Sequence, residues 1–250
     1  MSLPDHLKTS GHLIIPDWPA PANVKALQTT RAGGVSGKPY GSFNLGDHVG
    51  DAPLAVERNR MLLNTLLPSE PVWLEQAHGT VVANADLASC LPQADACIAR
   101  HRSAVCVVMT ADCLPVLLCD TQGSVVGVAH AGWKGLAAGV IEAAVQAMDV
   151  APQNLKAWLG PAIAQDAFEV GEEVRAAFVA IQPQSASAFI PGLNGKWFAD
   201  IYALARLRLN ALGIRQIFGG GYCTYRERER FFSYRRDGVT GRMGTFIWLE

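Results

Sequence analysis

Three apolar runs follow one another in the middle of the sequence and constrain the fold more than any other feature. They cover residues 103–110, 114–120 and 124–130, and valine, leucine and other apolar side chains dominate each of them. Short apolar runs of this kind, separated by only a few polar residues, are typical of buried β-strands. The middle of the chain therefore predicts a buried sheet that other elements must cover.

The rest of the chain alternates between predicted strands and helices. Periodic patterns predict helices over residues 53–67, 135–148, 169–181 and 200–213, the last ending at Gly213. They also predict strands over 71–86, with an interruption at His78 and Gly79, and over 155–163 and 243–249. The glycine-rich residues 29–51 show no periodicity and predict a long ordered loop. Because strands occur both in pairs and between helices, we expect an α+β fold with mixed sheets, in one domain over residues 1–250.

Composition excludes several classes of protein. Half of the 250 residues are apolar, and the net charge of -1 gives no electrostatic reason to expect nucleic acid or a membrane surface as a partner. The longest apolar region is interrupted by Asp112 and Pro115, and the first residues lack the pattern of a signal peptide. We therefore expect a cytoplasmic protein with reduced cysteines.

Three residues occur where an apolar strand meets glycine or proline. They are His78 in QAHG, Cys113 in TADCLP and His130 in AHAGWKG. Two imidazoles and one thiolate suit a catalytic zinc ion, which keeps three protein ligands and one open position. The same residues suit a metal-independent hydrolase, with Cys113 as nucleophile and His130 as base. Spacing alone does not separate these chemistries from plain packing and hydrogen bonding.

Cationic residues follow in two places. Lys134 lies between Gly132 and Gly135 at the start of a predicted helix, which suits an anion, although a solvated lysine explains the same pattern. Near the C-terminus, the arginine-rich segment 225–242 has a net charge of +3, from six arginines against three acidic residues. Its FSYRRDG stretch places Arg235 beside aromatic side chains, a combination that binds anionic or planar ligands.

Taken together, the ordered motifs resemble one bacterial family. The motifs are TTRAGGVSGKPYGSFNLGDHVGD, EQAHGTVV, ADACIAR, VMTADCLPVLL, GVAHAGWKGLAAGVI, WLGPAIAQDAFEVGEEV and GGGYCTYRERERFFSYRRDGVTGRMG. They look like the laccase-domain or multicopper polyphenol oxidase proteins, whose members are now regarded as purine nucleoside phosphorylases. The resemblance runs from Thr29 to the last predicted strand.

The resemblance implies both a fold and a site. It implies a four-layer α/β/β/α domain related to cysteine-hydrolase-like toxins. It also implies a zinc site on His78, Cys113 and His130, with copper as an alternative metal, and these three residues as the catalytic group. The implied reaction is phosphorolysis of adenosine, inosine and methylthioadenosine to free base and ribose 1-phosphate, with adenosine deamination as a side activity.

Four further residues are candidates for binding the substrates of such a reaction. Arg31, Lys134 and Arg235 are candidates for the phosphate, and Asn44 is a candidate for the ribose or the base. We expect purine nucleosides and phosphate as the partners. The sequence leaves the preferred nucleoside and the oligomeric state open.

Three alternatives stay beside this interpretation. A Cys/His hydrolase would cleave a small amide or ester, a cell-wall precursor being one example, and a zinc-stabilised binding module would have no turnover. A copper-dependent polyphenol oxidase is the third. A multicopper oxidase holds several copper ions on many imidazoles, whereas this chain has six histidines, of which two lie in ligand-like positions.

Overall fold

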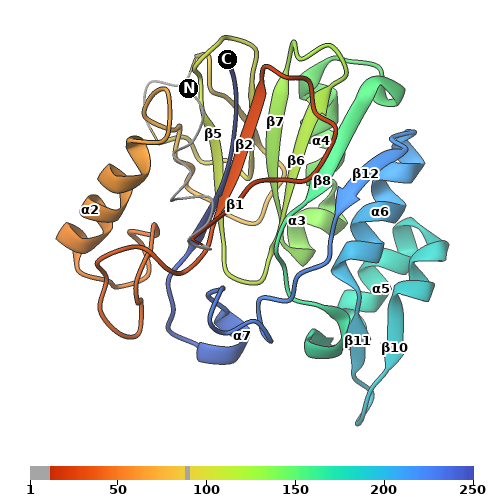
Figure 1. The fold of residues 1–250 in the computed structure, drawn as a ribbon. Helices are drawn as coiled ribbons and strands as arrows, with labels where there is room; N and C mark the ends of the chain where they lie inside the picture. The colour runs from red at the N-terminus through yellow and green to blue at the C-terminus, as the bar shows by residue number, and fades with distance from the viewer. Residues whose placement is uncertain (1–11, 88–90) are drawn as a thin grey trace.

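Two stacked β-sheets, enclosed by helices, form the centre of the computed structural model, which describes residues 12–87 and 91–250 (Figure 1). The strands are β1 (Leu13–Ile14), β2 (Val24–Thr29), β3 (Val82–Asn84), β4 (Ala96–Ala99), β5 (Cys106–Thr110), β6 (Leu114–Asp120), β7 (Val126–Ala131), β8 (Leu155–Leu159), β9 (Glu169–Val170), β10 (Phe189–Pro191), β11 (Trp197–Ala199), β12 (Gln216–Gly219) and β13 (Met243–Leu249). The α-helices are α2 (Pro53–Asn64), α3 (Trp133–Ala138), α4 (Val140–Met148), α5 (Glu172–Ile181), α6 (Ile201–Leu212) and α7 (Tyr234–Asp237).

The strands form one large mixed sheet and one smaller antiparallel sheet. The large sheet has six strands in the order β12-β8-β6-β7-β4-β3, and its pairs β12–β8 and β3–β4 are parallel. The four-stranded sheet has the order β1-β2-β13-β5, with every pair antiparallel. Strands β9, β10 and β11 make a separate small sheet.

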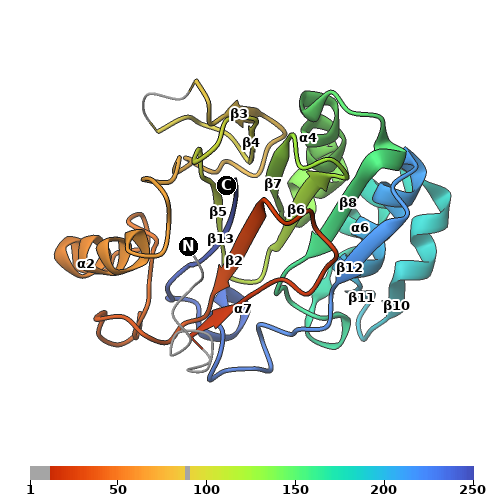
Figure 2. The ribbon, with the colours of Figure 1, turned by 45° about the horizontal axis from the view of Figure 1, so that its top comes forward.

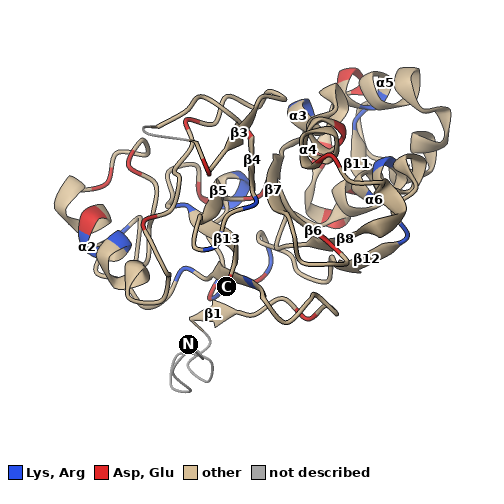
Figure 3. Cartoon of the chain, turned by 90° about the horizontal axis from the view of Figure 1, so that it is seen from above, with Lys and Arg blue, Asp and Glu red and all other residues tan. Residues whose placement is uncertain are grey.

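Alternation along the strands divides the apolar side chains among three cores. In β6, Leu117 joins the core between the two sheets, while its neighbour Leu118 joins the core under α4 and α6. In β13, Phe246 faces the third core, which also contains Leu63 of α2. Helices thus cover the outer face of each sheet, α2 on one side and α4 and α6 on the other (Figures 2 and 3). The expected α/β/β/α layering is confirmed.

Strands β6 and β7 form a hairpin that runs through the centre of the large sheet. Its turn is organised by Asp120, whose carboxylate accepts hydrogen bonds from the backbone N–H groups of Ser124 and Val125 and from the Ser124 hydroxyl. At the opposite end, Leu114 pairs with Ala131. This register brings the residue before β6, Cys113, opposite the residue after β7, Gly132.

The single helix predicted over residues 135–148 is wrong in one respect, because the chain forms two helices there. Gly139 separates α3 from α4 and has a φ angle of +103°, in the left-handed region that glycine adopts without steric cost. The hydrophobic pattern continues across this break, so periodicity alone did not reveal it.

The strand predicted over residues 71–86 is wrong for most of its length, since only β3 is a strand there, although the chain does leave the extended conformation at the predicted interruption, His78 and Gly79. His78 has a φ angle of +59°, and the backbone N–H groups of Ala77, His78 and Gly79 donate to the side chain of Asp95. Side-chain acceptors of this kind compete with a strand ladder for the backbone donors. The segment therefore wraps around a carboxylate instead of extending.

Other predictions are confirmed with small shifts at the boundaries. Residues 30–52 contain no helix or strand, as expected for the long loop. Helix α6 begins at the cap residue Asp200, whose carboxylate accepts from the Ala203 N–H, and it ends at Gly213 with a φ angle of +98°. Within residues 12–87 and 91–250, no helix combines the length and apolar character needed to cross a membrane.

Candidate metal centre

His78, Cys113 and His130 lie on three separate segments and converge at one corner of the large sheet. Their ligand atoms all lie within 4.8 Å of one another. The Cys113 Sγ atom is 3.9 Å from His78 Nε2, and the two imidazole rings stand edge to face with centroids 4.7 Å apart. His130 is buried, Cys113 is half-buried and His78 is exposed, so the group opens to solvent on the His78 side.

The absence of a side chain at Gly132 makes room for this group. A Cβ atom at Gly132 would lie 2.8 Å from Cys113 Sγ and 3.0 Å from His78 Cδ2. One turn later, a Cβ atom at Gly135 would lie 2.9 Å from the carbonyl oxygen of Gly79. The glycines of the AHAGWKG motif therefore let α3 approach the 77–79 segment and the thiol closely.

A buried aspartate that the sequence analysis missed contacts both histidines. The Asp95 carboxylate accepts a hydrogen bond from His130 Nδ1 at 2.8 Å and also accepts the three backbone N–H groups of residues 77–79. Nothing in the sequence around ADACIAR links this carboxylate to a segment sixteen to eighteen residues earlier in the chain. Only the register of β4 against β7, which pairs Ala96 with Ala129, brings it there.

The electrostatics of the group favour an ionised thiol. Burial acts to raise the pKa of the Cys113 thiol, but the imidazoles of His130 and His78 outweigh it and lower this pKa to about 6. Burial acts to lower the pKa of His130, but the Cys113 thiolate and the Asp95 carboxylate outweigh it and raise this pKa to about 9. A thiolate between two imidazoles results.

This donor set fits a zinc or copper ion. Zinc accepts imidazole nitrogen and thiolate sulfur, and three such ligands with an open fourth position are typical of catalytic sites. Within residues 12–87 and 91–250, it is the one group of three or more such side chains arranged to hold a metal. His130 also makes the hydrogen bond to a carboxylate that metal-binding histidines usually make.

A cavity of about 270 Å³ lies between the hairpin of β10 and β11, the start of α5, and α7. Its lining residues are Trp133, Phe168, Glu169, Val170, Gly171, Glu173, Val174, Lys196 and Arg235. Trp133 directly follows Gly132, and the backbone N–H of Arg235 donates to the carboxylate of Asp112, the neighbour of Cys113. Two lining residues, Trp133 and Arg235, are therefore connected to the residues beside Cys113, Trp133 through the chain and Arg235 through a hydrogen bond.

Of the four predicted substrate residues, Arg235 and Lys134 are exposed. Arg235 lines the cavity and donates to the backbone carbonyl of Glu169, with its guanidinium 5.5 Å from the centroid of the Phe168 ring. Lys134 is the second residue of α3, and its ammonium lies 5.8 Å from the centroid of the Trp133 ring. The structure thus places Arg235 in the cavity wall and Lys134 beside Trp133, which also lines the cavity.

Arg31 and Asn44 use their side chains in contacts within the long loop and between this loop and the C-terminal segment. Arg31 donates to the backbone carbonyls of Gly41 and Arg228 and stacks on Phe232, with its guanidinium 4.9 Å from the ring centroid. The Asn44 side chain is fully buried, and its amide donates to Gly46 and Asp51 and accepts from Gly46 and Arg242. These contacts indicate that Asn44 holds the loop together, and its predicted contact with substrate stays a prediction.

Arg242 is a second residue that the sequence analysis did not select. It immediately precedes β13, whose first residue, Met243, pairs with Thr110 at the end of β5. Burial lowers the pKa of the Arg242 guanidinium, against the opposing effect of the nearby Cys113 and Asp112. A half-buried cation therefore faces the same corner as the thiol.

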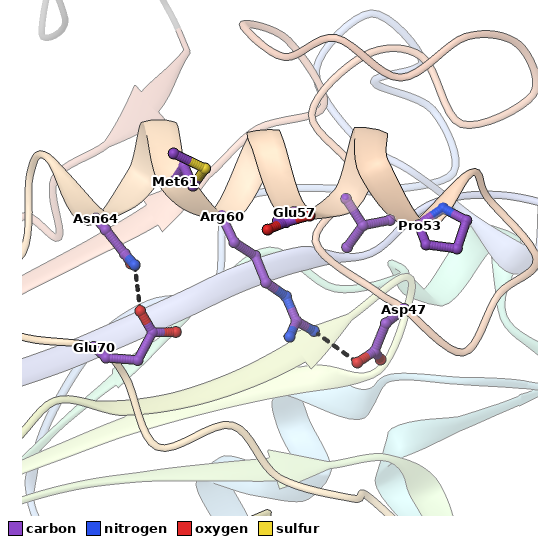
Figure 4. A pocket seen from close by; sticks show the side chains of 8 residues that line it. Asp47, Pro53, Glu57, Arg60, Met61, Asn64 and Glu70 are labelled. Atoms are coloured by element: carbon purple, nitrogen blue, oxygen red, sulfur yellow. Dashed lines mark hydrogen bonds and ion pairs between the residues drawn. The ribbon is translucent and has the colours of Figure 1, made fainter.

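Another cavity, of about 300 Å³, lies along α2 and contains none of the predicted site residues (Figure 4). Its most buried charge is Arg60, which lies 3.3 Å from Asp47 and donates twice to the backbone carbonyl of Leu45. The guanidinium also stacks 3.9 Å from the centroid of the Trp73 ring. These contacts fasten the long loop to α2.

Comparison with known proteins supports a family assignment over nearly the whole chain. Residues 25–250 match the family described as multi-copper polyphenol oxidoreductase laccase. A relative in Pseudomonas aeruginosa, named purine nucleoside phosphorylase PA4543, is 52% identical over 238 residues, which cover 95% of this chain and 98% of the relative. Purine nucleoside phosphorylase YfiH of Escherichia coli is 54% identical over 242 residues, again covering 95% and 98%.

A solved structure has the same fold. The crystal structure of the Neisseria meningitidis protein NMB0706 superposes with a TM-score of 0.93 at 52% sequence identity. The match covers 96% of this chain and 99% of that protein.

Proposed function

The chain belongs to the family described as multi-copper polyphenol oxidoreductase laccase, and from this membership and the site geometry we propose that it is a purine nucleoside phosphorylase. The observation that carries the proposal is the convergence of His78, Cys113 and His130 in a chain so similar to proteins of that name. The substrates we propose are inosine, adenosine and methylthioadenosine, with adenosine deamination as a side activity.

In the proposed reaction, a phosphate oxygen forms a bond to C1′ of the ribose while the bond from C1′ to the purine nitrogen breaks. The electron pair of the broken bond leaves with the base, which takes up a proton, and ribose 1-phosphate remains. Such a reaction needs cations that hold phosphate and a surface that holds a flat base. Arg235 and Lys134 supply charge close to Trp133, and the aromatic side chains of Trp133 and Phe168 border the cavity.

His78, Cys113 and His130 are the residues that would hold a metal, and we propose zinc, with copper as the alternative. A bound zinc ion supplies a Lewis acid that polarises a coordinated oxygen and lowers the pKa of coordinated water. Gly132, which has no side chain, leaves room for the group, and the imidazoles of His130 and His78 keep the Cys113 thiol ionised. Arg31 and Arg242 supply further positive charge beside the loop, where we propose that they help to retain phosphate.

The test is incubation of protein of known metal content with inosine and phosphate. We expect hypoxanthine and ribose 1-phosphate, and we expect Cys113→Ala and His78→Ala to remove most of this activity. His101→Ala is a suitable control because His101 is exposed and lies outside the group. Intact inosine after incubation with loaded protein, in phosphate or in water, would refute the proposal.

One observation favours a second function. Cys113, the two histidines and Asp95 also form a relay of nucleophile, base and orienting carboxylate, with His130 Nδ1 2.8 Å from Asp95. A metal-independent hydrolase of this kind would keep its activity in a chelator and lose it on alkylation of Cys113. The phosphorylase proposal predicts that chelation itself lowers activity. Oxidation of a phenol only after loading with copper would instead support a polyphenol oxidase.

A cytoplasmic location is part of the same proposal. It is supported by the cysteines that the structure describes, which are all free. Fractionation of cells with an antibody against the protein tests it.

A further inference from the structure

Asp95 lies immediately before β4 and its side chain is almost completely buried. Its main chain is fixed on both sides, because its N–H donates to the carbonyl of Val81 and its carbonyl accepts from the N–H of His130 at 2.7 Å. A buried carboxylate is costly unless its charge is compensated by hydrogen bonds. The hydrogen-bond partners of the Asp95 carboxylate therefore indicate its role.

The two carboxylate oxygens of Asp95 accept hydrogen bonds from four donors. These donors lie on the two segments that carry His78 and His130. Oδ1 accepts from His130 Nδ1 at 2.8 Å and from the His78 N–H at 2.9 Å. Oδ2 accepts from the Ala77 N–H at 3.1 Å and from the Gly79 N–H at 2.6 Å. A carboxylate has about four lone-pair positions. These contacts use all of them, so no position remains for a metal or a substrate.

The contact to His130 determines which ring nitrogen faces the thiol. His130 Nδ1 is the ring nitrogen that contacts Asp95, so Nε2 is the ring nitrogen directed toward Cys113 and His78. A metal ligand must present an unprotonated nitrogen. The hydrogen bond to Asp95 therefore holds the ring in the orientation that leaves Nε2 as the nitrogen available to a metal.

The contacts to residues 77–79 determine the position of His78. Its φ angle of +59° lies in the left-handed region, which is unfavourable for a residue with a Cβ atom. Three consecutive N–H groups converge on one carboxylate and hold the chain in that conformation. As a result, the backbone of His78 is held in place, and the centroid of its exposed ring lies 4.7 Å from the centroid of the His130 ring.

We propose that Asp95 is the positioning residue of the ligand group and orients both histidines with one carboxylate, His130 through its ring and His78 through its backbone. The inference rests on the proposed ligand set, and it goes beyond that set by assigning the geometry to a fourth, non-ligating residue. It explains how two ligands on different segments keep a fixed separation although one of them is exposed.

Asp95→Asn is the sharpest variant because asparagine keeps the size and replaces one oxygen with an N–H₂ group. That group faces N–H donors in either orientation, so the variant loses the hold on residues 77–79 or the contact to His130 Nδ1. Loss of such a contact typically weakens metal binding by about 10- to 100-fold. Asp95→Glu keeps the charge but displaces the oxygens, and it provides the measurement if the asparagine variant does not fold.

Asp86 provides a matched control. Its carboxylate also accepts two backbone N–H groups, those of Arg100 and His101, and it lies 3.8 Å from the imidazole of His101. It contacts no member of the ligand group. Asp86→Asn therefore removes a similar structural carboxylate without touching the site.

The experiment titrates metal-free wild type, Asp95→Asn, Asp95→Glu and Asp86→Asn with Zn²⁺ against a competing chelator. Each protein is also titrated with Co²⁺, and its sulfur-to-cobalt charge-transfer band is recorded at saturation. Circular dichroism and the melting temperature confirm that each protein is folded. We expect about 10- to 100-fold weaker Zn²⁺ binding and an altered cobalt band for both Asp95 variants, and wild-type behaviour for Asp86→Asn.

The outcomes separate this inference from the proposed function. Unchanged Zn²⁺ affinity and an unchanged cobalt band in folded Asp95→Asn would overturn the inference, even if the wild type cleaves inosine. Weakened binding in the Asp95 variants supports it, even if no nucleoside is cleaved. A wild type that binds neither metal would overturn the inference together with the proposed ligand set. A merely structural role would lower the melting temperature without altering the cobalt band.

Discussion

At the scale of single residues, the Cys113 thiol differs from the buried thiols of Cys106 and Cys119. Burial raises the pKa of Cys119 to about 12 and also raises the pKa of Cys106, whereas the pKa of Cys113 is lowered to about 6. The thiolate is the form that reacts with alkylating agents. Reactivity at neutral pH should therefore be concentrated at one position among the described cysteines.

Iodoacetamide at pH 7 should modify Cys113 first in the metal-free protein, and added Zn²⁺ should protect it. The rate should rise with the thiolate fraction and reach half of its maximum near pH 6. Peptide mapping by mass spectrometry locates the label, and Cys113→Ser provides the unlabelled control. Faster labelling of Cys97, Cys106, Cys119 or Cys223, or a rate that Zn²⁺ leaves unchanged, would contradict the assignment.

Gly132 should tolerate no side chain if the ligand group is to stay assembled. In Gly132→Ala the new methyl group would approach Cys113 Sγ and His78 Cδ2, so we expect Zn²⁺ affinity to fall by about tenfold or more while the fold is retained. The matched control is Gly221→Ala, where a Cβ atom meets nothing within 4 Å. Equal Zn²⁺ affinity in the two variants would show that the close approach is not needed.

At the scale of elements, the hairpin of β6 and β7 carries two of the three ligand residues, and its far turn depends on Asp120. Burial acts to raise the pKa of Asp120, but hydrogen bonds from Val125, Ser124 and Gln122 lower it below its ordinary value. A carboxylate whose pKa is lowered by folding stabilises the fold above its unfolded pKa. That stabilisation disappears as the pH falls through the folded pKa.

Asp120→Asn should therefore lower the free energy of unfolding by about 1.5–3 kcal/mol at pH 7, the range for hydrogen bonds to a charged group. The difference from wild type should shrink as the pH falls below about 4, where the wild-type carboxylate takes up its proton. Urea unfolding at several pH values measures this difference. Asp149→Asn, at an exposed carboxylate, should show no such dependence.

Elements also show which parts of the site the sequence could reveal. His78, Cys113 and His130 could be selected individually because each lies where a predicted apolar strand meets glycine or proline, and the resemblance grouped the three into one site. Asp95 could not be selected, because its role depends on the pairing of β4 with β7 and on a left-handed residue at His78. The break at Gly139 was hidden in the same way, since apolar periodicity continues through it.

At the scale of the whole molecule, the two sheets separate three apolar cores. Each sheet therefore packs against a different core on each of its two faces. The α+β class followed from predicted strands that occur both in pairs and between helices, and the α/β/β/α layering followed from the family resemblance. The order of the strands did not follow, because it depends on contacts between distant segments. That residues 1–250 form one domain stays a prediction, and the shared sheets provide a way to test it.

Leu117→Ala and Leu118→Ala remove buried side chains from opposite faces of one strand. Each should lower the free energy of unfolding by about 2–5 kcal/mol. If the layers unfold together, denaturant melts of both variants should show a single transition by circular dichroism and by tryptophan fluorescence. Two separate transitions in either variant would show that the layers unfold independently.

Strand β13 lies between β2 and β5, although it is the last strand of the chain. During synthesis, β2 and β5 emerge from the ribosome long before the strand that must pair with both of them. Until then their inner edges are unpaired, and unpaired edges are sites for pairing with other chains. The facing edges of β2 and β5 therefore stay open through most of synthesis, and the four-stranded sheet closes only when β13, up to residue 249, has been made.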